Sequence, residues 1–377
     1  MNKYSNRKSF PGETGNPIDV LLHKTSNFEH ISTGIFFIIL FLIAFIPVFW
    51  DWRKSAMLII FVILDWLLFA SLPHYRKSFG PFKISVLILA FTRLILTALP
   101  LTFGFGLNII GYLLVFWGVW VEPHRIKTTH QILRTVKLPA GFNLRVLHLA
   151  DLHLERITSR EIQLLGLIKE LSPDLILFSG DFLNLSYLKD AKALEDLHDV
   201  LKQWQAPLGV YAVTGSPAVD LPELIPHLVE GTGVRLLDNE TVDIQTPRGE
   251  MRLIGLSCSH RPNLDGPILE NLIANQPEKF NILLYHTPDL APKAANLGID
   301  LQMSGHTHGG QMRIPLIGAA VTGSLFGKRF ESGRYQINNM VLYVSRGLGM
   351  EGLGAPRARL FCPPEIILWE ITGSNQS

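Results

Sequence analysis

Between Thr33 and Val121 the chain is nearly free of charged side chains, and this feature limits the fold more than any other. The stretch holds only eight Asp, Glu, Lys or Arg residues. It divides into four apolar runs, each near the ~20 residues that a helix needs to cross hydrocarbon. The pattern predicts a transmembrane region of about four helices over residues 31–121, with three crossings as the alternative. The runs are Thr33–Trp50, Ala56–Leu72, Ile84–Leu101 and Phe103–Val121.

Composition agrees with this division of the chain and excludes some classes of function. Of the 377 residues, 47% are hydrophobic and only 18% are charged, whereas a soluble enzyme carries about a quarter charged residues. A purely cytosolic globular protein is therefore excluded. The net charge of +2 gives no electrostatic footprint for nucleic acid, so no nucleic-acid partner is expected. Cys258 and Cys362 make no disulfide framework.

The distribution of Lys and Arg predicts the orientation in the membrane. With four crossings, the polar tail (residues 1–30), the loop with Arg76 and Lys77, and the basic stretch 122–142 share one side. The other side keeps only Arg53 and Lys54. The positive-inside rule then places both termini in the cytoplasm, as expected for a multi-pass protein of the cell (inner) membrane with a cytoplasmic catalytic domain.

Two ionisable residues, Asp65 and Arg93, fall in the middle of apolar runs. An uncompensated charge there costs about 2.5–3.5 kcal/mol. We favour an ion pair or polar contact that fixes helix packing; the alternative is a substrate or ion path.

The second half of the chain reads as a soluble domain. Residues 122–142 are polar and basic, which indicates a linker at the membrane face or, alternatively, the first edge of the domain. From residue 143 to 377, short apolar runs alternate with helical patterns such as Arg160–Leu171 and Leu188–Trp204, which is typical of a layered α/β domain. The predicted strands are Leu144–Ala150, Leu175–Ser179, Leu208–Thr214, Met251–Leu256, Phe280–Tyr285, Asp300–Met303, Arg334–Ile337, Val341–Ser345 and Glu365–Ile371.

Metal-capable side chains follow these predicted strands at the point where each strand ends. They are Asp151, His153, Asp181, His286, His306 and His308. Since the carboxyl ends of strands in α/β sheets form a common crevice, we expect these side chains to converge. Imidazole with carboxylate suits Mn, Fe or Zn, and one shared Asp can bridge two ions ~3.5–4 Å apart. Such a pair binds phosphate oxygens and lowers the pKa of a bridging water, so the pattern predicts phosphoester hydrolysis.

The order Asp-x-His, Gly-Asp, His, Gly-His-x-His resembles the calcineurin-like metallophosphoesterase superfamily, and within it the membrane-anchored bacterial branch. The resemblance runs from Leu144 to the C-terminus and includes Ser345-Arg346-Gly347-Leu348-Gly349 and Pro363-Pro364-Glu365. It implies a layered αββα sandwich and a two-metal site. By the resemblance, Asp181 bridges the metals and, with His306, carries catalysis. The implied ligands are Asp151, His153 and His308 for the first metal, with His286 and His306 for the second.

One motif departs from the family's pattern. Where the family has Gly-Asn-His followed by Asp or Glu, this chain has Gly215-Ser216-Pro217-Ala218. A serine hydroxyl is a poor substitute for the Asn ligand, so we expect a weakened second metal site. Proline cannot protonate a leaving group, so any protonation of the leaving group must come from another residue. The candidates are Asn184, Asp220 and His260.

Three further predictions concern single residues. His260 is assigned to substrate binding, with a plain loop residue as the alternative. Arg346 is predicted to bind phosphate through two hydrogen bonds, a role that Arg357 and Arg359 could also fill. The alternative is that these arginines lie on the surface or pair with carboxylates. His148 alternates inward in a strand and is predicted to be a core histidine.

The sequence therefore predicts a membrane-anchored, metal-dependent hydrolase of a phosphoester or pyrophosphate bond, acting through a metal-bridging hydroxide. One membrane-associated branch of the resembling family acts on UDP-2,3-diacylglucosamine, so a lipid-linked substrate of that kind is a candidate. The alternative is a binding or regulatory module that has lost turnover. The predicted ligands are all present and the departure is confined to one loop, which favours the enzyme.

Overall fold

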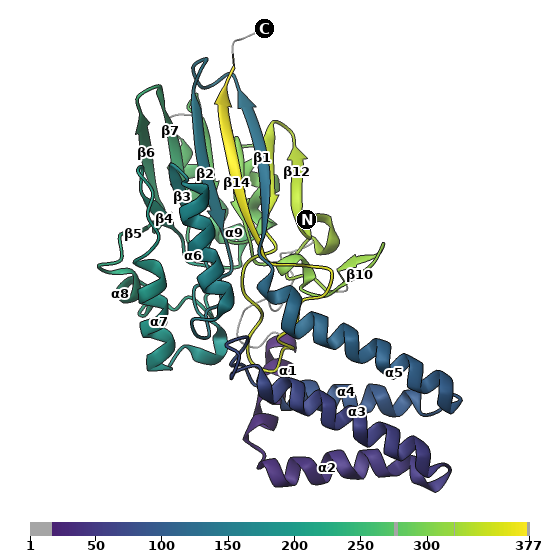
Figure 1. Ribbon diagram of the computed structural model, residues 1–377. Helices are drawn as coiled ribbons and strands as arrows, with labels where there is room; N and C mark the ends of the chain where they lie inside the picture. The colour runs from purple at the N-terminus through teal and green to yellow at the C-terminus, as the bar shows by residue number, and fades with distance from the viewer. Residues whose placement is uncertain (1–16, 275–277, 320, 375–377) are drawn as a thin grey trace.

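Two six-stranded β-sheets lie face to face in the C-terminal part of the chain (Figure 1). The computed structural model describes residues 17–274, 278–319 and 321–374, so Lys3, Arg7 and Lys8 of the predicted basic tail lie outside the described residues. In spatial order the first sheet holds β1 (Lys127–Thr135), β14 (Glu365–Gly373), β2 (Asn143–Leu149), β3 (Leu175–Phe178), β4 (Val210–Ala212) and β5 (Val234–Leu236). The second holds β12 (Gly333–Ile337), β13 (Met340–Val344), β9 (Leu301–Ser304), β8 (Asn281–Leu284), β7 (Gly249–Gly255) and β6 (Glu240–Thr246).

The strands that carry the site run parallel within each sheet. β2, β3, β4 and β5 pair in parallel, and so do β7, β8, β9 and β13. β14 is antiparallel to β2, and the outer strands β6 and β12 are antiparallel to their neighbours. Each parallel group therefore brings its carboxyl ends to one edge.

Helices cover the outer face of each sheet and complete the layered αββα sandwich. Between the sheets, apolar side chains such as Val146, Leu177 and Ile282 are fully buried. On the first sheet pack α6 (Ser159–Leu171) and α7 (Ala191–Leu201), and on the second α9 (Pro262–Ile273) and α10 (Ala291–Ala294). Because both faces are covered, β3 and β8 are buried at every residue, as suits the apolar sequence of β3 and the run Ile282–Leu284 of β8.

Local sequence signals set the limits of these helices. Thr158 caps α6 and exchanges hydrogen bonds with Glu161 in a capping box, and Asp190 accepts a hydrogen bond from the backbone of Ala193 at the start of α7 (2.9 Å). The remaining elements of the sandwich are the short helix α8 (Ile225–Val229) and the small hairpin of β10 (Arg313–Ile314) and β11 (Gly318–Ala319).

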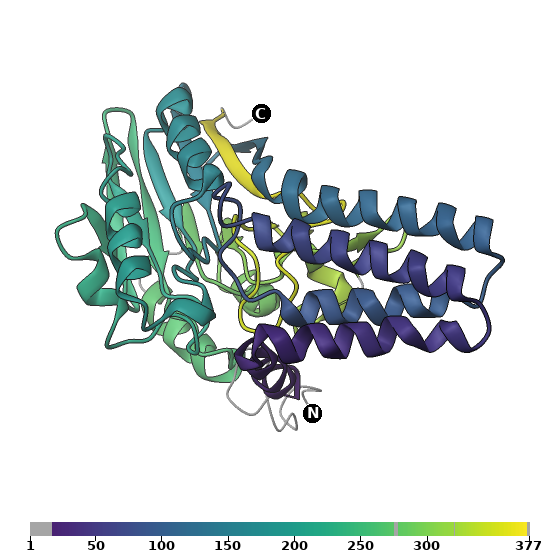
Figure 2. The same cartoon turned by 60° about the horizontal axis from the view of Figure 1, so that its bottom comes forward.

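The N-terminal part consists of helices that extend away from the carboxyl-end edge of the sandwich (Figure 2). They are α1 (Pro17–Ser26), α2 (Thr33–Phe45), α3 (Trp52–Ser71), α4 (Lys83–Leu96) and α5 (Leu101–Phe116). Two stretches are long and apolar enough to cross a membrane, Trp52–Ser71 and Leu101–His124, or three if the bent pair Lys24–His30 and Thr33–Phe49 counts as one. With 14 residues, α4 falls short of the ~20-residue length, so the predicted four crossings are not established.

Asp65, Arg93 and Asn108 form a buried polar cluster that joins α3, α4 and α5. Arg93 donates from Nε and Nη2 to the two carboxylate oxygens of Asp65 (2.6 and 2.8 Å) and from Nη1 to Oδ1 of Asn108 (2.9 Å). Asp65 is fully buried and Arg93 is 3% exposed. The pairing is the helix-packing contact that the sequence favoured.

Residues 122–142 contribute to the sandwich. Lys127–Thr135 forms β1, which pairs along its whole length with β14. Of the two predictions for this stretch, the edge of the domain therefore describes it better than the linker. A linker would leave its backbone to water, whereas here the ladder with β14 pairs the backbone groups on the side of β1 that faces the sheet.

Candidate metal centre

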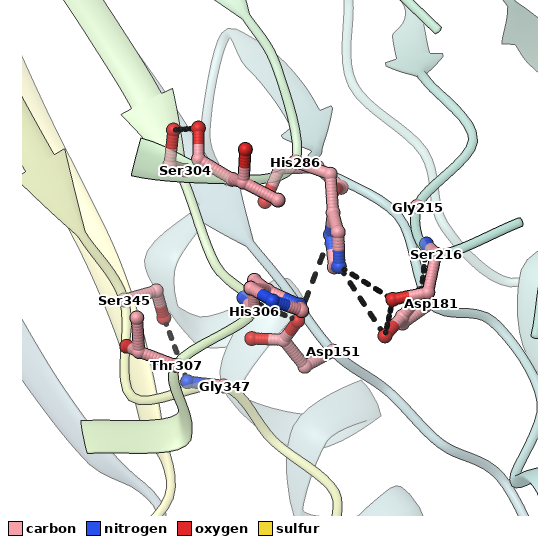
Figure 3. A network of polar contacts seen from close by, with 12 residues as sticks. Asp151, Asp181, Gly215, Ser216, His286, Ser304, His306, Thr307, Ser345 and Gly347 are labelled. Carbon is pink, nitrogen blue, oxygen red and sulfur yellow. Dashed lines mark hydrogen bonds and ion pairs between the residues drawn. The ribbon is translucent and has the colours of Figure 1, made fainter. Parts of the chain in front are cut away.

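Loops that follow strands of both sheets meet at the carboxyl-end edge and carry all of the predicted metal ligands. Asp151 and His153 follow β2, and Asp181 follows β3. From the second sheet, His286 follows β8 and the Gly305–His308 loop follows β9. The two sets face each other across the gap between the sheets (Figure 3).

The side chains form three overlapping groups, each with its ligand atoms within 4.8 Å of one another. Asp151, His153 and His308 make the first group, and the Nε2 atoms of the two imidazoles face each other at 3.1 Å, as two ligands of one ion do. Asp151, Asp181 and His286 make the second. The third is His260, His286 and His306.

Asp181 joins the groups. Its Oδ2 atom lies 3.3 Å from Nε2 of His153 and 3.3 Å from Nε2 of His286. Nδ1 of His286 meanwhile contacts the carbonyl oxygen of Ser179 (2.8 Å), which fixes the ring with Nε2 toward Asp181. A single carboxylate oxygen between two imidazole groups is the geometry of a bridging ligand.

Ser216 occupies the place at which the family's pattern has Asn. Its backbone N–H donates to Oδ1 of Asp181 (2.6 Å), its hydroxyl donates to Oδ2 of the same carboxylate (3.1 Å), and that hydroxyl lies 3.2 Å from Nε2 of His286. The close approach depends on Gly180 and Gly215, since a Cβ atom at either would collide with the other glycine or with Asp181. Ser216 thus belongs to the second metal group by position.

The groups are deeply buried, and their polar atoms are incompletely satisfied. Asp151 and His286 are 0% exposed, and Oδ2 of Asp151 and Nε2 of His306 have no hydrogen-bond partner within the described part of the chain. Buried carboxylates and imidazoles without partners are costly unless a cation compensates them. The donor set of carboxylate oxygens and imidazole nitrogens therefore fits divalent metal ions.

Backbone strain is concentrated at the same residues. Asp151, His153, Asp181, His306 and His308 all have positive φ, between 41° and 71°. Few non-glycine residues adopt this conformation, and such residues cluster at functional sites where the surrounding structure holds them. The strain turns each side chain sharply off the end of its strand and into the gap.

The electrostatics favour a charged carboxylate at the centre. Burial would raise the pKa of Asp181, but His286 and His153 lower it well below its ordinary value. Burial lowers the pKa of His153 and His286, while Asp181 opposes this and raises both to about 9. Burial, with neighbouring positive charge, keeps the pKa of His308 well below normal, so this imidazole is neutral and able to bind a cation.

Of the three candidates for the missing Asn-His pair, the structure brings one into the site. The His260 ring lies 4.6 Å from that of His306, centroid to centroid. Asn184 instead donates to the carbonyl of Met350 (2.9 Å). Asp220 accepts the backbone N–H groups of Asp181, Phe182 and Gly215 at 2.7–2.9 Å, so it supports the loop that holds the bridging carboxylate.

The candidate phosphate-binding arginines are engaged by protein groups. Arg346 pairs with Glu365 (3.0 Å), and Arg357 pairs with Glu155 (2.5 Å). Arg359 is fully buried, donates to the carbonyl oxygens of Gly349 and Cys362, and lies with Nη2 3.4 Å from Nδ1 of His308.

His148 is a core residue, as predicted. It is 0% exposed, and its Nε2 lies 3.0 Å from the hydroxyl of Ser179.

One neighbour of the centre was missed by sequence reasoning. The carboxylate of Glu351 lies 3.9 Å from Nε2 of His308, with a side chain 40% exposed at the opening of the site. The residue sits in the glycine-rich stretch Gly347–Gly354, after β13, and no spacing rule distinguished it from an ordinary loop residue.

Comparison with known proteins identifies relatives that share this region. The chain is 30% identical over 287 residues to the uncharacterised metallophosphoesterase YkuE of Bacillus subtilis, which covers 74% of this chain and 94% of that protein. It is 29% identical to the phosphodiesterase YaeI of Escherichia coli (60% and 82% covered). It is 25% identical to the UDP-2,3-diacylglucosamine pyrophosphatase LpxG of Chlamydia muridarum (67% and 91% covered). No family model matches the chain.

Proposed function

The chain belongs to the calcineurin-like metallophosphoesterases, which are hydrolases, and from this premise we propose that it is a membrane-anchored, two-metal phosphohydrolase acting on a lipid-linked pyrophosphate or phosphoester. The observation that carries the proposal is the position of Asp181 Oδ2, 3.3 Å from an imidazole of each metal group. A carboxylate oxygen placed between the two imidazole groups is suited to bind both ions.

In this proposal one ion is bound by Asp151, His153 and His308. The other ion is bound by His286 and His306, and Asp181 binds both ions. Two divalent ions of Mn, Fe or Zn, when bound, would supply Lewis acid sites for the phosphate oxygens and lower the pKa of a bound water. Ser216 orients Asp181 through its backbone N–H and hydroxyl. A serine hydroxyl is a weaker ligand than the Asn of the family's pattern, so the second ion would be the more loosely held of the two.

The substrate class follows from two features of the chain. First, Pro217 stands where a leaving-group acid is expected, which favours leaving groups that need little protonation, such as a phosphate released from a pyrophosphate. Second, the site opens at the edge of the sandwich next to the helical region. LpxG, a relative at 25% identity, is named for a lipid-linked pyrophosphate substrate, and a substrate of that class suits both features.

We further propose that the helical region anchors the chain in the cell membrane with the sandwich on the cytoplasmic side. Trp117 and Trp120, near the end of the apolar stretch Leu101–His124, suit the headgroup level. Arg125 stacks over Trp117 (5.5 Å to the ring centroid), where it would meet anionic headgroups.

Metal analysis combined with a substrate panel tests the proposal. The full chain, purified in detergent, is stripped with a chelator, reloaded with Mn, Fe or Zn, and assayed on a phosphomonoester, a phosphodiester and a nucleotide-lipid pyrophosphate. We expect activity to require metal, to saturate near two ions per chain, and to be highest on the pyrophosphate. Metal binding without turnover on any substrate would instead indicate a binding or regulatory module.

A further inference from the structure

A cavity of about 240 Å³ lies between the helical region and the loop that backs the metal centre. Its walls come from α3, α4 and α5 on one side and from Met312 and residues 356–360 on the other. Six of the residues that line the cavity are Ser85, Leu89, Leu114, Val119, Ala358 and Leu360. With Ser85 excepted, each of these side chains is apolar.

The loop of residues 358–360 lies between this cavity and the metal centre. Ala358 and Leu360 face the cavity. Arg359, between them, turns the other way and places Nη2 3.4 Å from Nδ1 of His308. The backbone N–H of Arg359 donates to the carbonyl oxygen of Gly118, at the end of the α5 segment (2.8 Å). A molecule in the cavity would therefore contact the loop whose Arg359 side chain reaches His308, a proposed metal ligand.

Ser85 gives the cavity a single polar feature. Among the described residues that line it, Ser85 carries the one polar side chain. It is 5% exposed, and its hydroxyl has no hydrogen-bond partner within the described part of the chain. Since a buried hydroxyl is costly when unpaired, this group is suited to a ligand that brings an acceptor into an apolar space.

The cavity is also continuous with the surface that faces the membrane in the proposed arrangement. Ile88 of α4 and Leu114 of α5 line it and are 49% and 42% exposed. They lie in apolar helices of the proposed anchor, so in that arrangement this side of the cavity faces acyl chains rather than water.

We infer that this cavity binds an acyl chain of the lipid-linked substrate, with the Ser85 hydroxyl donating to the carbonyl of the chain's ester or amide linkage. The inference rests on the proposed function and specifies its substrate as one that carries an acyl chain, which this cavity binds. Neither a soluble phosphate nor a polar peptide offers an apolar tail with one acceptor.

Photo-crosslinking tests the cavity without any need for turnover. The probe is phosphatidic acid with a diazirine in one palmitoyl chain, added to the full chain in detergent. We expect labelled peptides from α4, α5 and residues 356–360. The Ser85→Leu substitution, which fills the space and removes the donor, should lower labelling about tenfold, whereas Ser85→Ala should lower it less. Thr92→Leu is the matched control, because Thr92 is an exposed hydroxyl residue of the same helix outside the cavity.

Two outcomes would overturn the inference. One is labelling spread evenly over exposed helix residues such as Phe103 and Ile109. The other is labelling of the cavity peptides that Ser85→Leu and Thr92→Leu reduce equally. If Ser85→Leu does not fold, Leu89→Trp fills the same space from the neighbouring position and is compared with Thr92→Trp.

Kinetics with matched substrates separates this inference from the proposed function. Dodecyl diphosphate and methyl diphosphate carry the same phosphate chemistry with and without a long chain. We expect Ser85→Leu to raise KM about tenfold for the dodecyl compound and to leave kcat/KM for the methyl compound unchanged. Equal effects on both compounds would contradict the acyl site, whereas no hydrolysis of either by the wild type would contradict the proposed function and leave the crosslinking result standing.

Discussion

At the scale of single residues, the position of Asp181 makes the sharpest prediction. Because Oδ2 of this carboxylate faces an imidazole of each metal group, its loss should affect both ions at once. We expect Asp181→Asn to lower kcat by at least about 10³-fold while the thermal midpoint stays close to wild type. Steady-state assays under saturating Mn²⁺ with parallel thermal unfolding measure this, and Asp199→Asn, an exposed position on α7, is the control. Near-normal turnover would contradict the bridging role.

Ser216 and Pro217 lead to a second prediction, on the leaving group. General acid catalysis contributes roughly 10²–10⁴-fold, and its usual residue is absent here. We therefore expect the rate to fall steeply as the leaving-group pKa rises across a series of aryl and alkyl phosphate esters. The rival is protonation by His260, whose ring lies 4.6 Å from that of His306. A shallow dependence in the wild type that becomes steep in His260→Ala would favour the rival.

His148 predicts how stability depends on pH. Burial lowers the pKa of this histidine to about 3, against about 6.5 in an unfolded chain. The unfolded state therefore binds more protons below pH 6.5, so the contribution of neutral His148 is complete above that pH and is lost as the pH falls toward 3. At pH 5 the loss is about 2 kcal/mol. His148→Gln should flatten the pH dependence of the unfolding free energy by about this amount, while His227→Gln, exposed on α8, should not.

The residue order in the sequence was enough to select the side chains that converge. Each proposed ligand follows a strand, and the carboxyl ends of parallel strands share an edge, so Asp151 and His308 could be placed together across 157 positions of the chain. The contacts of Ser216 with Asp181 could not be predicted from the sequence, because they depend on the close approach of two glycine turns. The ion pair between Arg346 and Glu365 could not be predicted either, since Glu365 is the first residue of another strand, β14.

At the scale of elements, long apolar runs were located well, whereas some half-exposed edge strands were missed. The predicted strand Leu144–Ala150 corresponds to β2, and the predicted hairpin near Asn338-Asn339 corresponds to β12 and β13. β6 was missed because its sequence, ETVDIQT, is largely polar at the edge of the sheet; pairing with β7 orders it. Tertiary pairing of this kind overrides local propensity.

The cluster of Asp65, Arg93 and Asn108 predicts how the helices of the proposed anchor are held together. Removing one partner leaves the other charge buried and unpaired, which costs about 3–5 kcal/mol, whereas apolar replacement of both is often tolerated. We expect Asp65→Leu to lower the thermal midpoint in detergent markedly and the double variant Asp65→Leu, Arg93→Met to recover most of the loss. A double variant that is as unstable as the sum of the single variants would show that the two residues act independently.

At the scale of the whole molecule, the contacts of the basic residues show at which end of the helical region each loop lies. The loop after α3 lies against the sandwich: Ser159 N–H donates to the carbonyl oxygen of Arg76 (3.2 Å), and Lys77 Nζ donates to the hydroxyl of Ser159 (3.3 Å). At the other end of the helices, Lys54 Nζ donates to the carbonyl oxygen of Thr97 (2.7 Å), which joins the two distal turns. With Lys83, Arg125 and Lys127 added to Arg76 and Lys77, the end next to the catalytic domain is richer in Lys and Arg than the distal end, which has Arg53 and Lys54.

This arrangement predicts a cytoplasmic catalytic domain, because a Lys and Arg excess marks the cytoplasmic side. We expect green fluorescent protein fused after Ser377 to fluoresce and alkaline phosphatase at the same place to stay inactive. Alkaline phosphatase inserted between Trp50 and Asp51 should be active, since that turn lies at the distal end. Arg53→Glu with Lys54→Glu, which strengthens the asymmetry, should leave this pattern unchanged, while four added lysines at the same turn should weaken it. Active phosphatase at Ser377 in the unmodified chain would contradict the orientation and, with it, a substrate supplied from the cytoplasmic leaflet.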